Sequence, residues 1–521
     1  MRAKFGRALI GGMCAVLVVG GLVEFAAPAF AAECESGNPL SPPDVDGDMA
    51  ADVVVGVPSA ANGAGAVDVR GGLTAPVALT TAMLGAGSGE GAAFGSAIAI
   101  SDLDQDGCSD LVIGAPGEGQ SDLSDGAGDH EGQVHIAFGG RTGIDLSTTL
   151  TLPHDSSNLD RFGSALVLNK RYDGTTWVHD LWVGAPQATV SGQALAGEVF
   201  HYIISADPDS RVEASLREVR TQDSPGIPGA SEAGDRFGSV LASTDTAGVL
   251  VGIPNEDVGA ATNAGAVCFL RVDSTTGAPL ASQSWSQASA KVAGVPETGD
   301  QFGAAIGSRW EMAAIGVPGE DQGSKANSGM IQTLTLNAGG AFVPGSKFTQ
   351  DTAGVPGQLE AGDRFGAAVA VGISLTGYTG ATDVAVGAPG EDLDTVANAG
   401  AVNLINLKVE HKYNSEGPQP QFLQQGTNLV GITEAGDEVG SSLGLTLSYS
   451  EAKTDFKDRL LIGVPREDVG TDIDSGIVQS AFRTGWRSKF TSGSATYTAL
   501  KFSTDIVPRT YYGQVLAIPS D

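Results

Sequence analysis

Basic residues are scarce in this sequence, with 29 Lys and Arg against 61 Asp and Glu and a formal net charge of −32. Because phosphate binding depends on clustered Lys and Arg, this balance argues against nucleic acid as a partner. It suits a soluble protein that binds cations or keeps clear of anionic surfaces. Hydrophobic residues still make up 41% of the 521 residues, which is enough for a folded core and excludes a wholly disordered chain.

Long apolar segments are also lacking, except at the N-terminus. Residues 1–31 predict a secretory signal peptide, because a cationic start precedes an apolar stretch and a small-x-small cleavage pattern. These parts are Arg2, Lys4 and Arg7, then residues 8–23, then Ala29-Phe30-Ala31. A transmembrane anchor is the alternative, but the run is short and Glu24 and Pro28 interrupt it. We expect a mature chain of residues 32–521 without a membrane span, secreted and either free or associated with the cell surface.

Only four cysteines are present, and Cys14 lies in the expected signal peptide. Cys34, Cys108 and Cys268 remain, so at least one is free or pairs between chains. A Cys34–Cys108 disulfide could form in an oxidising compartment. Cys268 lies in an apolar strand and is expected to be a buried small hydrophobic residue.

Glycine and proline are abundant by contrast, at 74 and 24 residues, without the Gly-X-Y period of collagen. They mark a unit that occurs seven times. An aromatic-Gly pair opens the unit, a Gly-x-Pro triplet ends an apolar run, and a further Gly precedes alternating apolar residues. The triplets begin at Gly56, Gly114, Gly184, Gly252, Gly316, Gly387 and Gly463. The pairs begin at Phe94, Phe162, Phe237, Phe302 and Phe365, with degenerate copies at Val439 and Tyr512. The third mark is Gly65, Gly132, Gly197, Gly265, Gly329, Gly400 and Gly476.

Each unit predicts about four short β-strands. Apolar runs such as residues 110–113 are typical of strands, and the following Pro ends them because it cannot donate to a ladder. One such sheet cannot bury both of its faces, whereas seven arranged radially cover one another. We therefore predict an all-β, seven-bladed β-propeller of four-stranded blades that occupies residues 32–521 as a single domain. A solenoid or a string of sandwiches is the alternative.

The two ends of the repeat array complement each other. The first triplet has no aromatic-Gly pair before it, and the last pair, Tyr512-Gly513, has no triplet after it. We predict that the last strand, near residues 511–518, pairs with the strand near residues 52–57. The C-terminal strand would then enter the N-terminal blade and close the ring, which removes an open sheet edge.

The order of aromatic-Gly pair, acidic loop and Gly-Ala-Pro resembles the FG-GAP repeat. This is the unit of the seven-bladed propeller at the N-terminus of integrin α subunits and of related bacterial secreted proteins. The resemblance covers about residues 43–518. It implies an extracellular binding or adhesion module with calcium in some blades.

Two loops have the carboxylate spacing that a hard cation requires. Relative positions 1, 3, 5 and 9 hold Asp44, Asp46, Asp48 and Asp52 in the first unit, and Asp102, Asp104, Asp106 and Asp110 in the second. A carbonyl at position 7, from Ala50 or Cys108, would add another of the roughly six oxygens that calcium prefers. In the FG-GAP family these are calcium ligands, so the resemblance implies two Ca²⁺ sites. The alternative is an acidic turn whose Asp side chains cap backbone N–H groups.

The other five units lack this loop and are predicted to be metal-free. Asp180 matches position 9 of the third unit, but Tyr172 stands at position 1. Two other acidic patterns recur in the last four units. Glu-x-Gly-Asp begins at Glu232, Glu297, Glu360 and Glu434, and Glu-Asp begins at Glu256, Glu320, Glu391 and Glu467. Repetition at equivalent places predicts a structural role between blades. A ring of carboxylates that binds cations or a basic ligand is the alternative.

The combined observations predict a monomeric propeller whose calcium-rigidified loops bind an extracellular protein or glycan without catalysis. The six histidines show no metal-ligand spacing, and no catalytic constellation is evident. Trp177 could stack on a sugar, whereas Trp182 is expected in the core. The competing hypotheses are a hydrolase or lyase that acts on polysaccharide or lipid in the central channel, and a structural part of the cell envelope.

Overall fold

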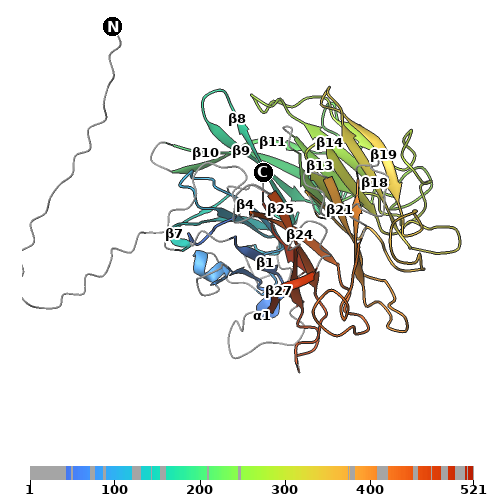
Figure 1. The fold of residues 1–521 in the computed structure, drawn as a ribbon. Coiled ribbons are helices and arrows are strands. Elements are labelled where there is room, and N and C mark those ends of the chain that lie inside the picture. The colour runs from blue at the N-terminus through green and yellow to red at the C-terminus, as the bar shows by residue number, and fades with distance from the viewer. Residues whose placement is uncertain are drawn as a thin grey trace, which may run out of the picture.

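The computed structural model describes a chain whose strands form seven sheets. Figure 1 shows these sheets following one another round a ring in chain order, until β24 and β27 return beside β1. The described residues are 43–47, 51–70, 77–85, 90–119, 131–141, 143–152, 160–207, 211–244, 248–373, 375, 382–407, 421–449, 456–470, 472–482, 491–498, 511–512 and 514–519. The predicted all-β, seven-bladed propeller is confirmed.

Each blade is an antiparallel meander whose first strand is innermost. Blade 1 contains β28(Val515–Leu516), β1(Val53–Val57), β2(Ala66–Arg70) and β3(Val77–Leu79), with the short α1(Ala60–Gly63) and η1(Thr81–Leu84). Blade 2 contains β4(Ala97–Ser101), β5(Asp110–Ala115), β6(Gln133–Phe138) and β7(Asp145–Thr151). Blade 3 contains β8(Ala165–Tyr172), β9(Trp177–Ala185), β10(Glu198–Ala206) and β11(Val212–Arg220). Blade 4 contains β12(Val240–Ser243), β13(Gly248–Ile253), β14(Ala266–Arg271) and β15(Gln283–Trp285). Blade 5 contains β16(Ala305–Arg309), β17(Met312–Val317), β18(Met330–Leu336) and β19(Phe342–Phe348). Blade 6 contains β20(Ala368–Ile373), β21(Thr382–Ala388), β22(Ala401–Asn406) and β23(Gln421–Leu423). Blade 7 contains β24(Ser442–Tyr449), β25(Phe456–Val464), β26(Ile477–Phe482) and β27(Thr491–Thr498).

The three glycine marks of the repeat lie where backbones of neighbouring blades meet. Gly65 in blade 1 has φ of 85°, and a Cβ there would overlap the backbone of Phe94. A Cβ on Gly56 of the triplet would likewise overlap the carbonyl of Gly95. The first contact recurs round the ring, from Gly132–Phe162 to Gly476–Tyr512, and the second recurs from Gly114–Gly163 to Gly387–Gly440. The repeat therefore keeps glycine at these places because no side chain fits between the blades.

The core lies between adjacent blades. One apolar cluster combines Val112 and Val134 of blade 2 with Leu168, Leu181 and Tyr202 of blade 3. Trp182 is fully buried in blade 3 and Cys268 is fully buried in blade 4, so both core predictions are confirmed. Since each sheet covers the face of the next, the radial arrangement supplies the burial that one four-stranded sheet could not.

The C-terminal segment closes the ring as predicted. Val515 and Leu516 of β28 pair antiparallel with β1. Tyr512 is fully buried, and its hydroxyl donates to Asp68 Oδ2 at 2.6 Å. One pairing was not predicted: β29(Ile518–Pro519) adds to β4 of blade 2 in parallel, which gives that blade a fifth strand. The last strands therefore join blades 1 and 2 to each other.

The inner strands of all seven blades line a central cavity of about 230 Å³. Its lining consists of Ala, Gly, Ile, Leu and Val residues with the serines 239, 243 and 308. No charged side chain and no histidine is among these lining residues. The centre of the ring is apolar.

The meander topology assigns the loops to two faces. Loops between the first and second strands of every blade lie at one face, here called the β1-entry face. Loops after the second strand, and the linkers between blades, lie at the other, here called the linker face.

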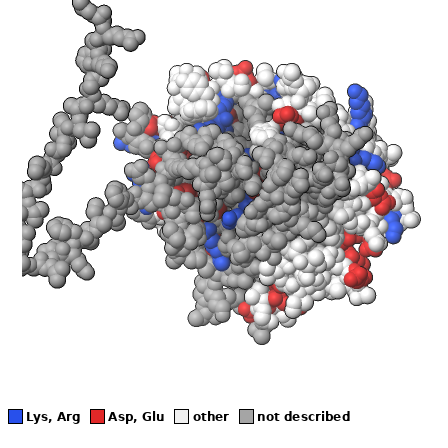
Figure 2. Space-filling model, viewed as in Figure 1, with Lys and Arg blue, Asp and Glu red and all other residues white. Residues whose placement is uncertain are grey.

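In the view of Figure 2, Lys and Arg on the described surface are interspersed with Asp and Glu and form no continuous basic patch. No helix in the described part of the chain is long and apolar enough to cross a membrane.

Candidate metal centre

The first acidic loop precedes β1 at the β1-entry face. Asp44, Asp46 and Asp52 are buried, and one carboxylate oxygen of each lies within 4.8 Å of the others. Asp52 Oδ2 accepts the Val45 N–H at 2.6 Å, and Asp44 Oδ1 accepts the Gly47 N–H at 2.8 Å. The backbone therefore folds round the carboxylates. The predicted ligands Asp48 and Ala50 lie outside the described residues.

The second acidic loop connects β4 to β5. Asp102, Asp104 and Asp106 bring one carboxylate oxygen each within 4.8 Å of the others. The fourth predicted carboxylate is separate: Asp110 Oδ2 accepts the Leu103 N–H at 2.7 Å and its Oδ1 accepts the Gly139 N–H at 2.9 Å. Cys108 donates its N–H to Asp106 Oδ1 at 2.7 Å, and its carbonyl stays a predicted ligand. Three of the four carboxylates thus converge, and Asp110 holds the loop in shape.

The electrostatics of the second loop reflect crowded carboxylates. Burial, with the neighbouring Asp106 and Asp102 charges, raises the pKa of Asp104 to about 6. Burial also raises the pKa of Asp102, although Lys170 opposes the shift. The Asp102 Oδ1 atom is buried and has no hydrogen-bond partner. Partly dehydrated carboxylates that face one another are the arrangement that a bound cation relieves.

The two loops are joined directly. The Ser109 N–H donates to the Asp44 carbonyl at 2.8 Å, and the Gly140 N–H donates to the Val45 carbonyl at 3.3 Å. The loops therefore form one acidic surface across blades 1 and 2. Cys108 is also disulfide-bonded, and its partner lies outside the described residues, so the Cys34–Cys108 pairing stays a prediction.

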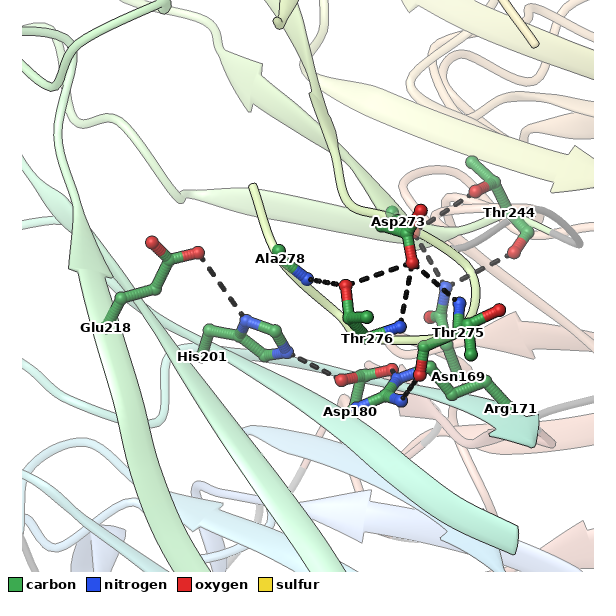
Figure 3. A network of polar contacts seen from close by, with 11 residues as sticks. Asn169, Arg171, Asp180, His201, Glu218, Thr244, Asp273, Thr275, Thr276 and Ala278 are labelled. Atoms are coloured by element: carbon green, nitrogen blue, oxygen red, sulfur yellow. Dashed lines mark hydrogen bonds and ion pairs between the residues drawn. The ribbon is translucent and has the colours of Figure 1, made fainter. Parts of the chain in front are cut away.

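Blade 3 replaces the acidic loop with the polar network drawn in Figure 3. Arg171 Nε donates to Asp180 Oδ2 at 2.5 Å, and the other Asp180 oxygen lies 2.7 Å from His201 Nε2. The His201 ring stacks on Trp182 with centroids 3.9 Å apart, and Nδ1 lies 3.7 Å from Glu218 Oε1. Asp180 occupies position 9 of the acidic-loop pattern in this blade. Its carboxylate therefore has the Arg171 guanidinium as its neighbour, where blades 1 and 2 have further carboxylates. His201 is fully buried in the interior of blade 3.

Several interacting residues were missed from sequence. Arg171 directly precedes Tyr172, which occupies the position of the first Asp in the acidic loops. A basic residue there signals that a guanidinium, and not a metal ion, balances the charge of Asp180. Gln425 donates Nε2 to Glu467 Oε2 at 2.6 Å, and Glu434, Asp437 and Glu467 form a third group of carboxylates within 4.8 Å. A signal existed for these as well. A glutamine precedes each Glu-x-Gly-Asp by nine or ten residues. These glutamines are Gln222, Gln287, Gln350 and Gln425.

Sequence comparison with known proteins identifies one copy of the repeat. The FG-GAP repeat family model matches residues 94–136. Integrin α-PS2 of Drosophila melanogaster is 34% identical over 159 residues, which are 30% of this chain and 11% of that protein. Phosphatidylinositol-glycan-specific phospholipase D of Bos taurus is 35% identical over 124 residues, which are 21% of this chain and 13% of that protein. The chain thus spans about a tenth of the length of these relatives. A periplasmic gluconolactonase of Pseudomonas aeruginosa has a similar structure at 12% identity and a TM-score of 0.40, over 86% of this chain and 96% of that one.

Proposed function

From the propeller fold, the FG-GAP repeat match and the similarity to an integrin α subunit, we propose that this chain is a secreted, calcium-binding module that acts outside the cell. It binds a protein or glycan ligand without catalysis, as a monomer. The observation that carries the proposal is the pair of joined acidic loops on blades 1 and 2.

The residues of both loops fit calcium. Their donors are all oxygen, which is the ligand type of a hard cation. The buried, unpartnered Asp102 Oδ1 has no other group to satisfy it among the described residues. Asp44, Asp46 and Asp52, with the predicted Asp48 and Ala50, would hold one ion. Asp102, Asp104 and Asp106, with the predicted Cys108 carbonyl, would hold the other, and Asp110 would shape the loop through its two backbone hydrogen bonds.

Calcium, when bound, supplies positive charge that offsets the repulsion among these carboxylates. The chain itself supplies the support. Asp110 ties Leu103 to Gly139, and the Ser109–Asp44 hydrogen bond transmits order from one loop to the other. Rigid loops lose little entropy on binding, so a preorganised β1-entry face favours ligand binding.

Three observations support an extracellular location. The first 31 residues have the pattern of a signal peptide, which is removed on secretion. Cys108 is disulfide-bonded, and disulfides persist in oxidising compartments. The integrin α similarity is to a protein type whose propeller is extracellular.

A hydrolase or lyase acting on polysaccharide or lipid is the second candidate. The match to a phosphatidylinositol-glycan-specific phospholipase D favours it. This hypothesis places the active site in the central cavity, whose lining is apolar apart from three serines. General acid–base chemistry needs titratable side chains near the substrate, and the lining residues provide none. We therefore favour binding.

A pull-down tests the proposal directly. The mature protein is incubated with intact producer cells, their wall polysaccharides and a glycan panel, in calcium and again in chelator. Saturable binding that is lost in chelator, and lost in an Asp102→Ala, Asp106→Ala variant, is the expected result. Absence of binding in both conditions, together with turnover of a polysaccharide or phospholipid, would replace the proposal by the second candidate.

A further inference from the structure

One side-chain contact recurs at four successive blade junctions. A Gln two residues after the outer strand of one blade reaches the Glu that follows the triplet of the next blade. Each contact, here called a junction pair, therefore connects two blades at the linker face. The four junction pairs are Gln222–Glu256, Gln287–Glu320, Gln350–Glu391 and Gln425–Glu467.

Each junction pair makes one hydrogen bond and leaves one acceptor unsatisfied. The Gln Nε2 donates to the Glu Oε2, at 2.7 Å for Gln222 and at 2.6 Å for Gln425. The Oε1 atoms of all four glutamines are buried without a hydrogen-bond partner, and none of these side chains is more than 4% exposed. A buried acceptor without a partner costs free energy, so its fourfold repetition indicates a missing donor.

The protonation state of the Glu decides whether that donor exists. An ionised carboxylate only accepts hydrogen bonds, whereas a protonated carboxyl group also has one O–H donor. The amide of a Gln carries a donor and an acceptor side by side, as a carboxylic acid does. A protonated Glu can therefore accept the Nε2–H with one oxygen and donate the O–H of the other to Oε1. An ionised Glu can do only the first.

The charges round the junction pairs favour the protonated form. No Lys or Arg in the described part of the chain forms an ion pair with any of the four Glu, although Lys347 and Lys325 act on Glu320 and Asp363 from further away. Other carboxyl groups face every pair. They are Glu232, Asp235 and Asp257 at the first pair, Glu297 and Asp300 at the second, Glu360, Asp363 and Asp392 at the third, and Glu434, Asp437 and Asp468 at the fourth.

The acidity of the four Glu agrees with this geometry. Burial, reinforced by the nearby carboxylates and opposed by the Gln N–H, raises the pKa of Glu256 and Glu320 to about 7 and that of Glu391 to about 8. Burial raises the pKa of Glu467 as well.

The other blades treat the same position differently. In blade 2 the equivalent Glu118 has His135 Nε2 at 2.7 Å. Blades 1 and 3 have Ala60 and Ala188 there. The Glu that lacks a basic partner is thus the one that faces a Gln amide.

We propose that each junction pair is a proton-binding site, in which a neutral Glu donates its O–H to the Gln Oε1 and accepts the Nε2–H. The junctions from blade 3 to blade 7 are then fastened by four protons, and each fastening weakens when its proton leaves. An unfolded Glu releases its proton near pH 4.5, whereas these folded Glu release theirs near pH 7 to 8. The folded chain holds protons that the unfolded chain has lost, so the free energy of unfolding falls as pH rises across this range.

Carboxyl NMR of the mature chain, labelled with carbon-13 in Glu, tests the protonation directly. Spectra are recorded in chelator, so that metal ions do not contribute. The four resonances are assigned by the single variants Glu256→Gln, Glu320→Gln, Glu391→Gln and Glu467→Gln. All four carboxyl groups should be protonated at pH 6 and ionised at pH 9. Any of them that is ionised at pH 6 contradicts the proton at its junction.

Infrared spectroscopy tests the hydrogen bond. The C=O stretch of the protonated carboxyl groups should be present at pH 6 and disappear at pH 9. Gln350→Met removes the amide of the third junction pair. The Glu391 band should then move to higher wavenumber, because its C=O and O–H lose their partners. A band that stays in place would contradict the pairing.

The number of protons released on unfolding, taken from the slope of the urea-unfolding free energy against pH, tests the coupling to stability. A variant with all four Glu→Gln substitutions keeps an amide at each junction and cannot titrate there. At pH 6 it should release about four fewer protons than the wild type. The matched control carries Asp257→Asn, Asp321→Asn, Asp392→Asn and Asp468→Asn, which make the same change in charge beside the pairs. It should release as many protons as the wild type.

An equal reduction in the fourfold variant and its control overturns the proposal, and so does no reduction in either. If the fourfold variant does not fold, Glu391→Gln alone should release about one proton fewer. An unchanged number in that variant contradicts the site.

Discussion

Blades 1 to 3 and blades 4 to 7 share one backbone plan but handle negative charge differently. Blades 1 and 2 gather Asp carboxylates in loops at the β1-entry face. Blade 3 sets Arg171 and His201 against Asp180 in its interior. At the junctions from blade 3 to blade 7, carboxylates gather at the linker face beside Gln amides. The glycine marks are nevertheless common to all.

The comparison teaches that all repeats keep glycine where the backbones of neighbouring blades touch. They differ in the group that balances the charge of a buried carboxylate. A Cβ at Gly65 or Gly476 would overlap the next blade in either part of the ring. Which group faces a buried carboxylate is decided blade by blade. A cation from the chain suffices in blade 3, whereas we propose a cation from solution in blades 1 and 2 and a proton at the later junctions.

The largest effect is expected from removing the C-terminal strands, on which closure of the whole ring depends. A chain that ends at Pro508 lacks β28, β29 and the buried Tyr512, so blade 1 loses its inner strand and blade 2 its fifth. We expect no cooperative thermal transition by circular dichroism, because an open ring exposes a strand edge and two apolar blade faces. A chain ending at Pro519 is the control and should melt like the full chain. A cooperative transition at the wild-type temperature in the shorter chain would contradict ring closure.

Arg171→Met tests whether blade 3 is independent of calcium. The variant leaves Asp180 buried without its guanidinium, which typically costs about 3–5 kcal/mol of unfolding free energy. Urea unfolding should show the same loss in calcium and in chelator. Arg211→Met removes an exposed pair at 3.9 Å and is expected to cost close to nothing. A loss confined to calcium would mean that Arg171 serves the neighbouring loop instead.

The double variant Asp102→Ala, Asp106→Ala should lose stability in calcium and not in chelator, unlike Arg171→Met. With calcium at about a hundredfold above its Kd, binding stabilises the folded state by about 3 kcal/mol, and the variant forfeits this gain. Differential scanning calorimetry should show a lower Tm in calcium and little change in chelator, because there the relief of carboxylate repulsion offsets the lost Asp106–Cys108 hydrogen bond. Asp173→Ala, in the corresponding loop of blade 3, removes a cap on the Thr175 and Thr176 N–H groups. It should lower Tm equally in both conditions, and a matching pattern in the Asp102 variant would reject the loop site.

His179 predicts a smaller, pH-dependent effect at the boundary of blades 2 and 3. Burial, with the Lys170 charge, lowers its pKa to about 3, while Nε2 lies 2.9 Å from Ser101 Oγ. Between pH 6.5 and 3 the unfolded chain binds a proton that the folded chain does not, so stability falls as pH falls. At pH 5 the penalty is about 2 kcal/mol. His179→Gln should therefore narrow the stability difference between pH 7.5 and pH 5 by about that amount in urea unfolding. An unchanged difference would show that His179 is protonated in the fold.

The features that sequence predicted are those with local steric or spacing rules. The order of glycine marks predicted seven blades, because each mark sits at a backbone contact that excludes a side chain. The alternating Asp pattern predicted that Asp102, Asp104 and Asp106 converge. Asp110 has the right spacing, but its two oxygens take backbone N–H groups from Leu103 and Gly139.

The features that sequence did not predict depend on distant partners. Gln425 and Glu467 are 42 positions apart and belong to different blades, so neither pattern alone indicates their contact. The role of Arg171 can be recognised only when the fold brings Asp180 and the Thr275 carbonyl beside its guanidinium. The parallel pairing of β29 with β4 involves two residues and has no periodic signal.

Closure by the C-terminal strands also sets the order in which the molecule can be made. The bond between Tyr512 and Asp68 joins residues 444 positions apart. At translation rates of about 5–20 residues per second, the partner of β1 is synthesised roughly 20–90 s after β1 itself. During that interval the nascent chain presents the unpaired edge of β1, and bringing its ends together is the slow, non-local step typical of such topologies. Ring closure is therefore post-translational, and the first blade keeps an unpaired edge until the last residues are synthesised.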